Sequence, residues 1–226
     1  MEGIYYVMFK EEFQMIIVLI GSPGSGKGTQ GQLLARKLNL PHVSTGDIFR
    51  QMVKVNNKDG LLIKEYMAQG KLVPPKLVNN VVKEFLTQDI YKNGYVLDGY
   101  PRNLEQANFL RMFANQKIKV VFFDIDDQVI IKRILGRFNC ENCGQIYNSY
   151  FIKPKVDNVC DVCGSDKFMH RQDDDEQTIK QRIEEYKIET YPLLHYYRDN
   201  SEFYVVDANK DKEEVELVLY KVLKMI

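Results

Sequence analysis

The chain has 226 residues, of which 45% are hydrophobic and 27% charged, a mixture typical of globular and not of disordered proteins. Lysine plus arginine and aspartate plus glutamate number 31 each, so a net charge of zero gives no global attraction to nucleic acid or anionic lipid. No apolar run approaches the roughly 18–20 residues of a membrane helix, and the N-terminus lacks a signal-peptide pattern. We therefore expect a cytoplasmic enzyme or switch with neither a nucleic-acid nor a membrane partner.

Strand and helix signals alternate along the chain. The predicted strands are residues 15–20, 41–44, 94–98, 119–124 and 203–207. The predicted helices are residues 26–38, 75–88, 103–116 and 129–138, one long helix opened by Asp173, Asp174 and Asp175, and a closing helix over 215–226. Strands separated by helices predict one α/β core, with a five-stranded parallel sheet covered by helices on both faces. Residues 1–14 precede this pattern, and we interpret them as an N-terminal extension, either docked on the core or following an upstream start codon.

A glycine-rich segment, Gly21-Ser-Pro-Gly-Ser-Gly-Lys-Gly-Thr29, follows the first predicted strand and opens a helix. Gly21, four further residues and then Gly26-Lys27 is the spacing of a phosphate-binding loop. Backbone N–H groups and the helix N-terminus attract phosphate oxygens, and Lys27 adds a full positive charge. An ordinary strand-to-helix turn is the weaker alternative, because both flanking elements are the expected ones. Gly28 follows the lysine where the general motif has a hydroxyl, which here comes at Thr29.

Four cysteines form two C-x2-C pairs separated by sixteen residues: Cys140, Cys143, Cys160 and Cys163. In a reducing compartment this spacing predicts one tetrahedral zinc site and disfavours two disulfides. Four thiolates leave no open coordination position, so the predicted metal is structural. The segment of about 35 residues is too small for a hydrophobic core of its own, and a metal would explain how it folds.

These motifs, taken in order, resemble those of nucleoside monophosphate kinases. The matching segments are the glycine-rich loop, Ser44-Thr-Gly-Asp-Ile-Phe-Arg50, Gly70-Lys-Leu-Val-Pro74, and Asp98-Gly-Tyr-Pro-Arg102 with Gln106. Arg137, the cysteine insert, Arg171-Gln-Asp-Asp174 and Arg182 are similar to the long zinc-binding lid of bacterial adenylate kinases. The resemblance extends from Met15 to the C-terminus, with Tyr100 and Pro75 as departures from the commoner residues.

The resemblance implies a reversible transfer of the terminal phosphoryl group of ATP to AMP, giving two ADP. It implies a monomer that uses Mg²⁺ with ATP and one structural Zn²⁺. A GTP:AMP phosphotransferase or another nucleoside monophosphate kinase is the alternative. The expected division is a P-loop core (15–43, 74–136 and 171–226), an AMP-binding subdomain (44–73) and a zinc-binding lid (137–170).

Residue roles follow from the same resemblance. The donor ATP is placed on Gly24, Ser25, Gly26, Lys27, Gly28, Thr29, Arg137, Ile146, Tyr147 and Lys210. The acceptor AMP is placed on Thr45, Arg50, Lys71, Leu72, Val73, Gly99, Tyr100, Pro101, Arg102, Gln106, Arg171 and Arg182. The catalytic set is Lys27, Asp98, Arg102, Arg137, Arg171 and Arg182, with Asp98 holding Mg²⁺ through water, while Asp173 and Asp174 help to close the lid.

Several of these residues also have ordinary structural interpretations. Thr45 fits a helix cap, Arg50 and Arg102 fit surface arginines, and Asp98 fits a turn at a strand end. The acids that follow Arg171 suit a helix N-terminus. Two other protein classes are disfavoured. A GTPase switch would need an Asn-Lys-x-Asp motif, and neither Asn57-Lys-Asp nor Asn209-Lys-Asp-Lys fits it. A zinc-ribbon nucleic-acid binder would need an excess of basic residues around the cysteines. From residue 137 to residue 171, five Lys/Arg stand against four Asp/Glu.

We predict that residues 1–14 are dispensable for turnover, because they lie outside every matched motif. A protein that starts at Met15 should keep near-normal activity, measured beside the full chain in the same assay. Some loss of thermal stability is compatible with this interpretation. A folded truncated protein that has lost most of its activity would contradict it.

Overall fold

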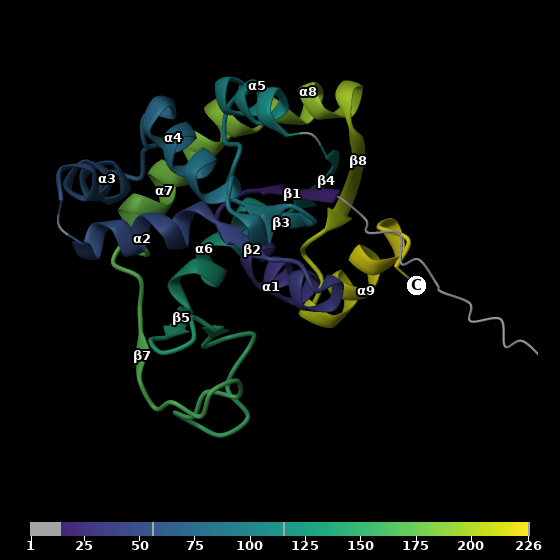
Figure 1. The fold of residues 1–226 in the computed structure, drawn as a ribbon. Helices are drawn as coiled ribbons and strands as arrows, with labels where there is room; N and C mark the ends of the chain where they lie inside the picture. Colours follow the sequence, from purple (N-terminus) through teal and green to yellow (C-terminus); the bar gives the residue numbers. More distant parts are fainter. Residues whose placement is uncertain (1–14, 56, 115, 226) are drawn as a thin grey trace, which may run out of the picture.

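The computed structural model describes residues 15–55, 57–114 and 116–225. In this part of the chain a five-stranded parallel sheet has the order β2-β3-β1-β4-β8, and a three-stranded antiparallel sheet has the order β6-β5-β7 (Figure 1). The strands of the large sheet are β1 (Met15–Gly21), β2 (His42–Ser44), β3 (Gly94–Asp98), β4 (Lys117–Asp124) and β8 (Glu202–Asp207). The predicted α/β core is confirmed. The interpretation of residues 1–14 lies outside the described residues.

The central strand β1 is buried on both faces, as its unbroken apolar run predicts. Ile16 and Val18 face a cluster shared with α4 (Pro75–Leu86), α5 (Leu104–Phe113) and α8 (Leu193–Asn200). Ile17 and Leu19 face a second cluster shared with α1 (Lys27–Leu38) and α9 (Lys212–Val222). Figure 1 shows α5 and α8 on one side of the sheet and α1 and α9 on the other. This arrangement brings the carboxyl ends of β1 and β3 to one edge, where α/β proteins bind ligands.

The segment between β2 and α4 forms two helices that the periodicity did not reveal, α2 (Thr45–Val55) and α3 (Lys58–Ala68). Ser44 caps α2, since its Oγ accepts a hydrogen bond from the Asp47 N–H at 3.3 Å. Asn57 caps α3 in the same way, accepting from the Gly60 N–H at 2.8 Å. Ser44, and not Thr45, is therefore the helix cap, which leaves the Thr45 hydroxyl for another partner.

Four predicted helices end earlier than expected, and those over 75–88 and 215–226 do so at Leu86 and Val222. The helix predicted over 103–116 is α5, which ends at Phe113, because β4 begins at Lys117 and pairs with Met15 of β1. The helix predicted over 129–138 is α6 (Asp127–Leu135). It ends at Gly136, where a Cβ would lie 2.5 Å from the Tyr150 ring, and the chain continues as a strand.

The single long helix predicted after Asp175 is wrong. It divides into α7 (Glu176–Glu185), a π-helical turn η2 (Tyr186–Thr190) and α8. Pro192 lacks the N–H that would continue the helical hydrogen bonds, which accounts for a break at this point. Asp175 caps α7, accepting from the Thr178 N–H at 2.9 Å, so the other two acids of the triplet are free for different contacts.

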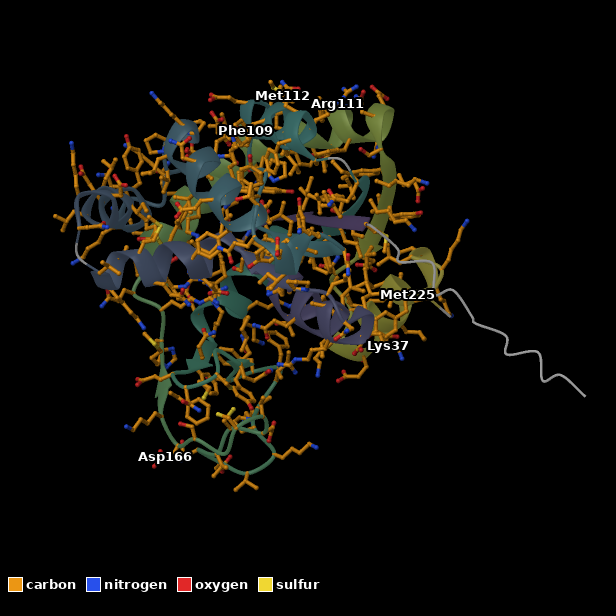
Figure 2. The ribbon with its side chains drawn as sticks, in the orientation of Figure 1. Lys37, Phe109, Arg111, Met112, Asp166 and Met225 are labelled. Atoms are coloured by element: carbon orange, nitrogen blue, oxygen red, sulfur yellow. The ribbon has the colours of Figure 1, made fainter. Side chains whose placement is uncertain are left out.

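The cysteine segment carries the small sheet, with β5 (Arg137–Cys140), β6 (Ile146–Asn148) and β7 (Phe168–Met169). Its interior holds Tyr147, Cys140 and Cys160, with Phe138, Ile152 and Phe168 packed against them. Asp166 marks the outer tip of this lid, far from Met112 on α5 (Figure 2). A short 3-10 turn, η1 (Asp89–Tyr91), leads into β3. Among the described helices, none has the length and apolar character to span a bilayer.

Candidate active site

The glycine-rich loop has the geometry of an anion site. Gly24 and Gly26 adopt left-handed φ angles of 80° and 88°, which a residue with a side chain rarely adopts, and α1 begins directly after them. The Oγ atoms of Ser22 and Ser25 are buried and find no hydrogen-bond partner in the described part of the chain. Unpaired buried donors at a helix N-terminus suit a ligand rich in oxygen acceptors.

Lys27 lies in this loop, and its Nζ donates to the Ser22 carbonyl at 3.2 Å. Burial lowers the pKa of Lys27 to about 8, and the charges of Arg102, Arg182 and Arg137 act in the same direction, while Asp98 opposes them. The predicted donor and acceptor halves of the site therefore share one electrostatic environment.

A cleft opens between α2, the start of α4 and the end of β3. Nine of the twelve predicted AMP-binding residues line it: Thr45, Arg50, Lys71, Leu72, Val73, Gly99, Arg102, Gln106 and Arg182. A second hollow, lined by Lys27 and Pro101, shares Arg102 and Arg182 with the first. The cleft and the phosphate loop are therefore connected through two arginines.

Two side chains of the acceptor motif are fixed by backbone contacts. The Thr45 hydroxyl donates to the Gly99 carbonyl at 2.8 Å. Gln106 Oε1 accepts from the Arg102 N–H at 2.7 Å, which leaves the amide N–H₂ end of Gln106 as the group free to face a ligand. Tyr100 lies behind the cleft, fully buried, and its hydroxyl donates to Asn79 Oδ1 at 2.8 Å. A contact of Tyr100 with a nucleotide stays a prediction, and its side chain is part of the core.

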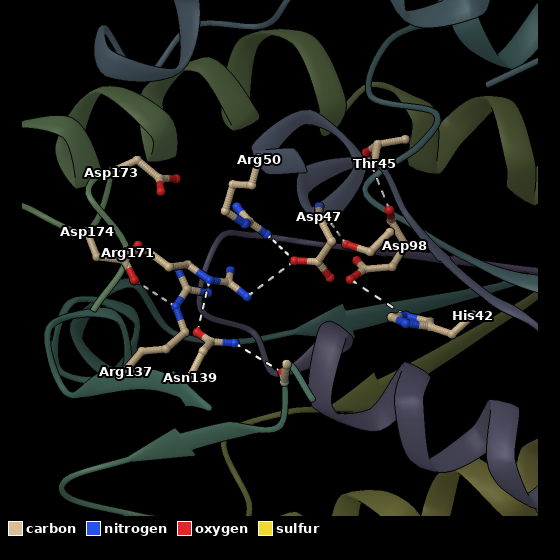
Figure 3. A network of polar contacts seen from close by, with 12 residues as sticks. His42, Thr45, Asp47, Arg50, Asp98, Arg137, Asn139, Arg171, Asp173 and Asp174 are labelled. Atoms are coloured by element: carbon tan, nitrogen blue, oxygen red, sulfur yellow. Dashed lines mark hydrogen bonds and ion pairs between the residues drawn. The ribbon is translucent and has the colours of Figure 1, made fainter. Parts of the chain in front are cut away.

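A charge network joins α2 to the two ends of the lid (Figure 3). Asp174 accepts two hydrogen bonds from Arg137, from Nε at 2.8 Å and from Nη2 at 2.5 Å. Asp173 accepts from Arg182 Nη1 at 3.0 Å. Both acids therefore neutralise arginines that the sequence assigns to the phosphates.

Asp47 occupies the middle of this network, between two arginines. Its Oδ1 lies 2.6 Å from Arg50 Nη2 and 3.9 Å from Arg171 Nη2 (Figure 3). Arg171 Nε also donates to Asn139 Oδ1 at 3.2 Å. The side chain of Arg171 is only 11% exposed, so Arg171 is not an ordinary surface arginine. Neither Asp47 nor Asn139 was predicted, because their importance comes from contacts between distant segments.

Burial and mutual repulsion strain this cluster electrostatically. Desolvation lowers the pKa of Arg102, Arg171 and Arg182 below the ordinary arginine value, and neighbouring arginines add to that shift. Burial works against the charged carboxylates of Asp47 and Asp173 as well, but the surrounding arginines outweigh it and lower their pKa. The cluster has more cations than acids, so an anion would relieve its repulsion.

The lid lies over the phosphate loop. Gln145 Oε1 accepts from Arg36 of α1 at 3.4 Å, and Ile146 Cδ1 is 3.5 Å from where a Cβ on Gly28 would stand. Tyr147, predicted to bind ATP, turns its side chain into the cysteine cluster. The loop has a second neighbour that the sequence analysis missed, Arg133 of α6.

Arg133 donates to the carbonyls of Ala208 and Lys210, at 2.8 and 3.1 Å, and its Nη1 is 3.9 Å from where a Cβ on Gly26 would lie. Its guanidinium lies over the Phe151 ring, 5.6 Å from the centroid. Arg133 thus joins the lid, the phosphate loop and the predicted ATP-binding segment at Lys210. The sequence offered one signal for this role, since Arg133 stands one helical turn before Arg137.

The carboxylate of Asp98 faces the start of α1 at the end of β3. Oδ2 lies 4.0 Å from His42 Nε2 and 3.2 Å from where a Cβ on Gly28 would be. Oδ1 is buried and has no hydrogen-bond partner among the described residues. A buried carboxylate oxygen left unpaired beside a phosphate loop fits a hydrated divalent cation.

The four cysteines meet in one cluster, with Sγ atoms within 4.8 Å of one another. Two of the distances are 3.6 Å (Cys140–Cys163) and 3.5 Å (Cys143–Cys160). A tetrahedron with zinc–sulfur bonds of about 2.3 Å has edges of about 3.8 Å, so the donor set fits zinc. Gly144 and Gly164, in left-handed conformation, close two matching turns over the cluster.

Comparison with known proteins assigns the fold and site to a family. A family model described as adenylate kinase matches residues 19–202. The chain belongs to the adenylate kinase family. Relatives named adenylate kinase from Rickettsia africae and Rickettsia conorii are 54% identical over 211 residues, which is 93% of this chain and all of each relative. The relative from Rickettsia bellii is 52% identical over the same shares.

Membership of the adenylate kinase family makes the chain a phosphotransferase that transfers the terminal phosphoryl group of ATP to AMP. No observation favours GTP as donor or another acceptor. The family also implies Mg²⁺ bound with the ATP. The resemblance drawn from the sequence motifs is thereby confirmed.

We predict that ATP binding to this adenylate kinase-family chain takes up protons above neutral pH. The pKa of Lys27 in the free protein is about 8, and a bound phosphate favours the charged amine and raises it. At a pH between the pKa of Lys27 in the free protein and its higher pKa in the ATP complex, the complex holds more protons than the free protein. The affinity for ATP should therefore fall as the pH rises above 8. Calorimetry in buffers of different ionisation enthalpy measures the uptake. Lys27→Met should abolish it, and the same uptake in that variant would contradict the assignment.

We predict that lysine replaces Arg137, Arg171 or Arg182 poorly, because each guanidinium holds groups that a single amine cannot hold together. Removing one positioned charge donor typically costs about 3–4 kcal/mol of barrier, so single-turnover rates should fall by roughly 10²–10³ with the fold intact. Arg111→Lys, on the exposed surface of α5, is the matched control. Rates near the wild-type value in all three variants would contradict the catalytic role of these arginines.

Proposed function

We propose that the ATP–AMP transfer takes place where the phosphate loop, the acceptor cleft and the two ends of the lid meet. One observation carries this proposal, the convergence of six cations from separate segments: Lys27, Arg50, Arg102, Arg137, Arg171 and Arg182. The loop and Lys27 hold the phosphates of ATP. The arginines hold the AMP phosphate and the group in transfer.

The chemistry needs no protein nucleophile and no strong base. An AMP phosphate oxygen is already anionic, and it attacks the γ-phosphorus of ATP in line while the bond to the β-phosphate oxygen breaks. Catalysis then consists of positioning and charge stabilisation, which fixed guanidinium groups supply. We place Lys27 beside the phosphates of ATP and the arginines around the AMP phosphate and the group in transfer.

Closure of the lid excludes water, which would otherwise compete with AMP as acceptor. We place the moving parts at residues 44–73 and 137–170, on a core of the remaining residues. Asp173 binds Arg182, which lines the cleft, and Asp174 binds Arg137 at the start of the lid, which supports the predicted part of both acids in closure. Asp47, in the first of these parts, lies 3.9 Å from Arg171, the first residue after the second part.

The acceptor base is selected by Gln106. Because its Oε1 is engaged by the Arg102 N–H, it presents an N–H donor toward the cleft. Adenine offers an unprotonated ring nitrogen at its Watson–Crick edge, and guanine offers an N–H there instead. The donor of Gln106 therefore fits AMP and leaves GMP with two facing donors.

Two metals complete the proposal. Asp98 would hold Mg²⁺ through water, and the metal would neutralise phosphate charge there. Cys140, Cys143, Cys160 and Cys163 would hold one structural Zn²⁺ that fixes the lid without entering the reaction. We also propose a monomer in a reducing, cytoplasmic location, where four clustered cysteines would bind a metal instead of forming disulfides.

We predict that AMP is the best acceptor and ATP the best donor, with dependence on Mg²⁺ and reversal from ADP. Product formation is measured with AMP, GMP, CMP and UMP in turn, each paired with ATP and with GTP. Lys27→Met protein, purified in parallel, controls for contaminating kinases. A clear preference for UMP or CMP would overturn the acceptor assignment.

We predict about one zinc per chain in elemental analysis of the purified protein. Removal of the metal should lower the melting temperature more than the initial rate at low temperature, since the centre supports the lid and not the chemistry. Protein reloaded with zinc after chelation is the control. An unchanged melting curve after complete removal would refute the structural role.

A further inference from the structure

Tyr147 is the most deeply buried tyrosine of the lid and lies beside the cysteine cluster. Only 1% of it is exposed. Its ring stacks on Phe138, with centroids 5.7 Å apart and planes at 22°, and meets Phe168 edge-on. These contacts fix the direction of the hydroxyl, because an aromatic side chain has only two rotatable bonds.

The hydroxyl has two partners, and both belong to the second cysteine pair. The Asp161 N–H donates to the Tyr147 oxygen at 2.8 Å. Cys160 Sγ lies 3.5 Å from that oxygen, within the range of a hydrogen bond to sulfur. Because the Asp161 N–H occupies an acceptor position of the phenol, the O–H proton is directed to the sulfur.

Tyr147 also connects parts of the lid that are separate in sequence. It belongs to β6, which pairs with β5 and so with Cys140 of the first cysteine pair. Its hydroxyl reaches Cys160 of the second pair. The side chain thus bridges the two halves of the cluster that must come together around a metal.

From this geometry we propose that Tyr147 is a positioning residue of the metal centre, whose phenol donates a hydrogen bond to the Cys160 thiolate. This inference rests on the proposed zinc site. The bond orients one ligand before the metal arrives, and it draws electron density from the sulfur once the metal is bound. Outer-shell partners of this kind typically contribute about 10–100-fold to metal affinity. Tyr147 was predicted as an ATP contact from the resemblance, and its side chain has this separate role.

The test uses the full chain and the variant Tyr147→Phe, which removes one oxygen and keeps the stacked ring. Tyr150→Phe, at an exposed tyrosine of the same lid, is the matched control. Zinc affinity is measured by competition with a chromophoric chelator. We expect about 10–100-fold weaker binding in Tyr147→Phe and no change in the control. Cobalt(II) is then loaded in place of zinc, and the sulfur-to-metal charge-transfer band should move to lower energy in Tyr147→Phe alone.

The outcomes separate this inference from the zinc proposal. Wild-type protein that takes up no zinc would overturn both. Stoichiometric zinc in the wild type, with affinity and cobalt spectrum unchanged in Tyr147→Phe, would overturn only the role of Tyr147. Circular dichroism verifies folding of the variant. Should it not fold, the unmutated zinc-loaded protein decides the matter by NMR: a Tyr147 hydroxyl proton shielded from exchange supports the bond, and a freely exchanging one overturns it.

Discussion

Repulsion among buried cations is the constraint on which the site depends. Six positive side chains form one electrostatic cluster, and four carboxylates offset part of their charge: Asp47, Asp98, Asp173 and Asp174. Lys27, Asp98 and Arg137 stand at the ends of α1, β3 and β5, where the fold fixes the backbone. Phosphates bring the charge that the cluster lacks, so substrate binding and assembly of the site favour each other.

Local sequence determined the parts of the fold and site that could be predicted. The loop from Gly21 to Thr29 needs only a strand, a turn and a helix, and the cysteine spacing is itself the metal pattern. The roles of Asp47 and Asn139 depend on a meeting of α2 with the lid, which no local pattern encodes. The break at Pro192 was overlooked in the sequence, although a proline inside a helical pattern favours one, and Ser44 was missed as a cap beside the equally plausible Thr45.

The lid has its own interior and few ties to the core. One tie is the end of α6, where Asn148 Nδ2 donates to the Arg133 carbonyl at 2.6 Å and the Ser149 N–H donates to the Gly136 carbonyl at 2.8 Å. Further ties are the hydrogen bond of Gln145 with Arg36, the cation–π contact of Phe151 with Arg133, and the polar contacts of Arg137 with Asp174 and of Arg171 with Asn139. Apolar packing therefore holds the lid together, while mostly polar contacts place it on the core, which agrees with the closure proposed above.

The strand order of the large sheet also governs the sequence of events during synthesis. β1 is made early and lies at the centre, but Met15 pairs with Gly94 on one side and with Lys117 on the other. The central strand must therefore wait for about a hundred further residues to leave the ribosome before both its edges are covered, and such distant pairing is slow. The cysteines span a short stretch that appears after those strands. The nascent chain thus completes most of its sheet before the lid can form.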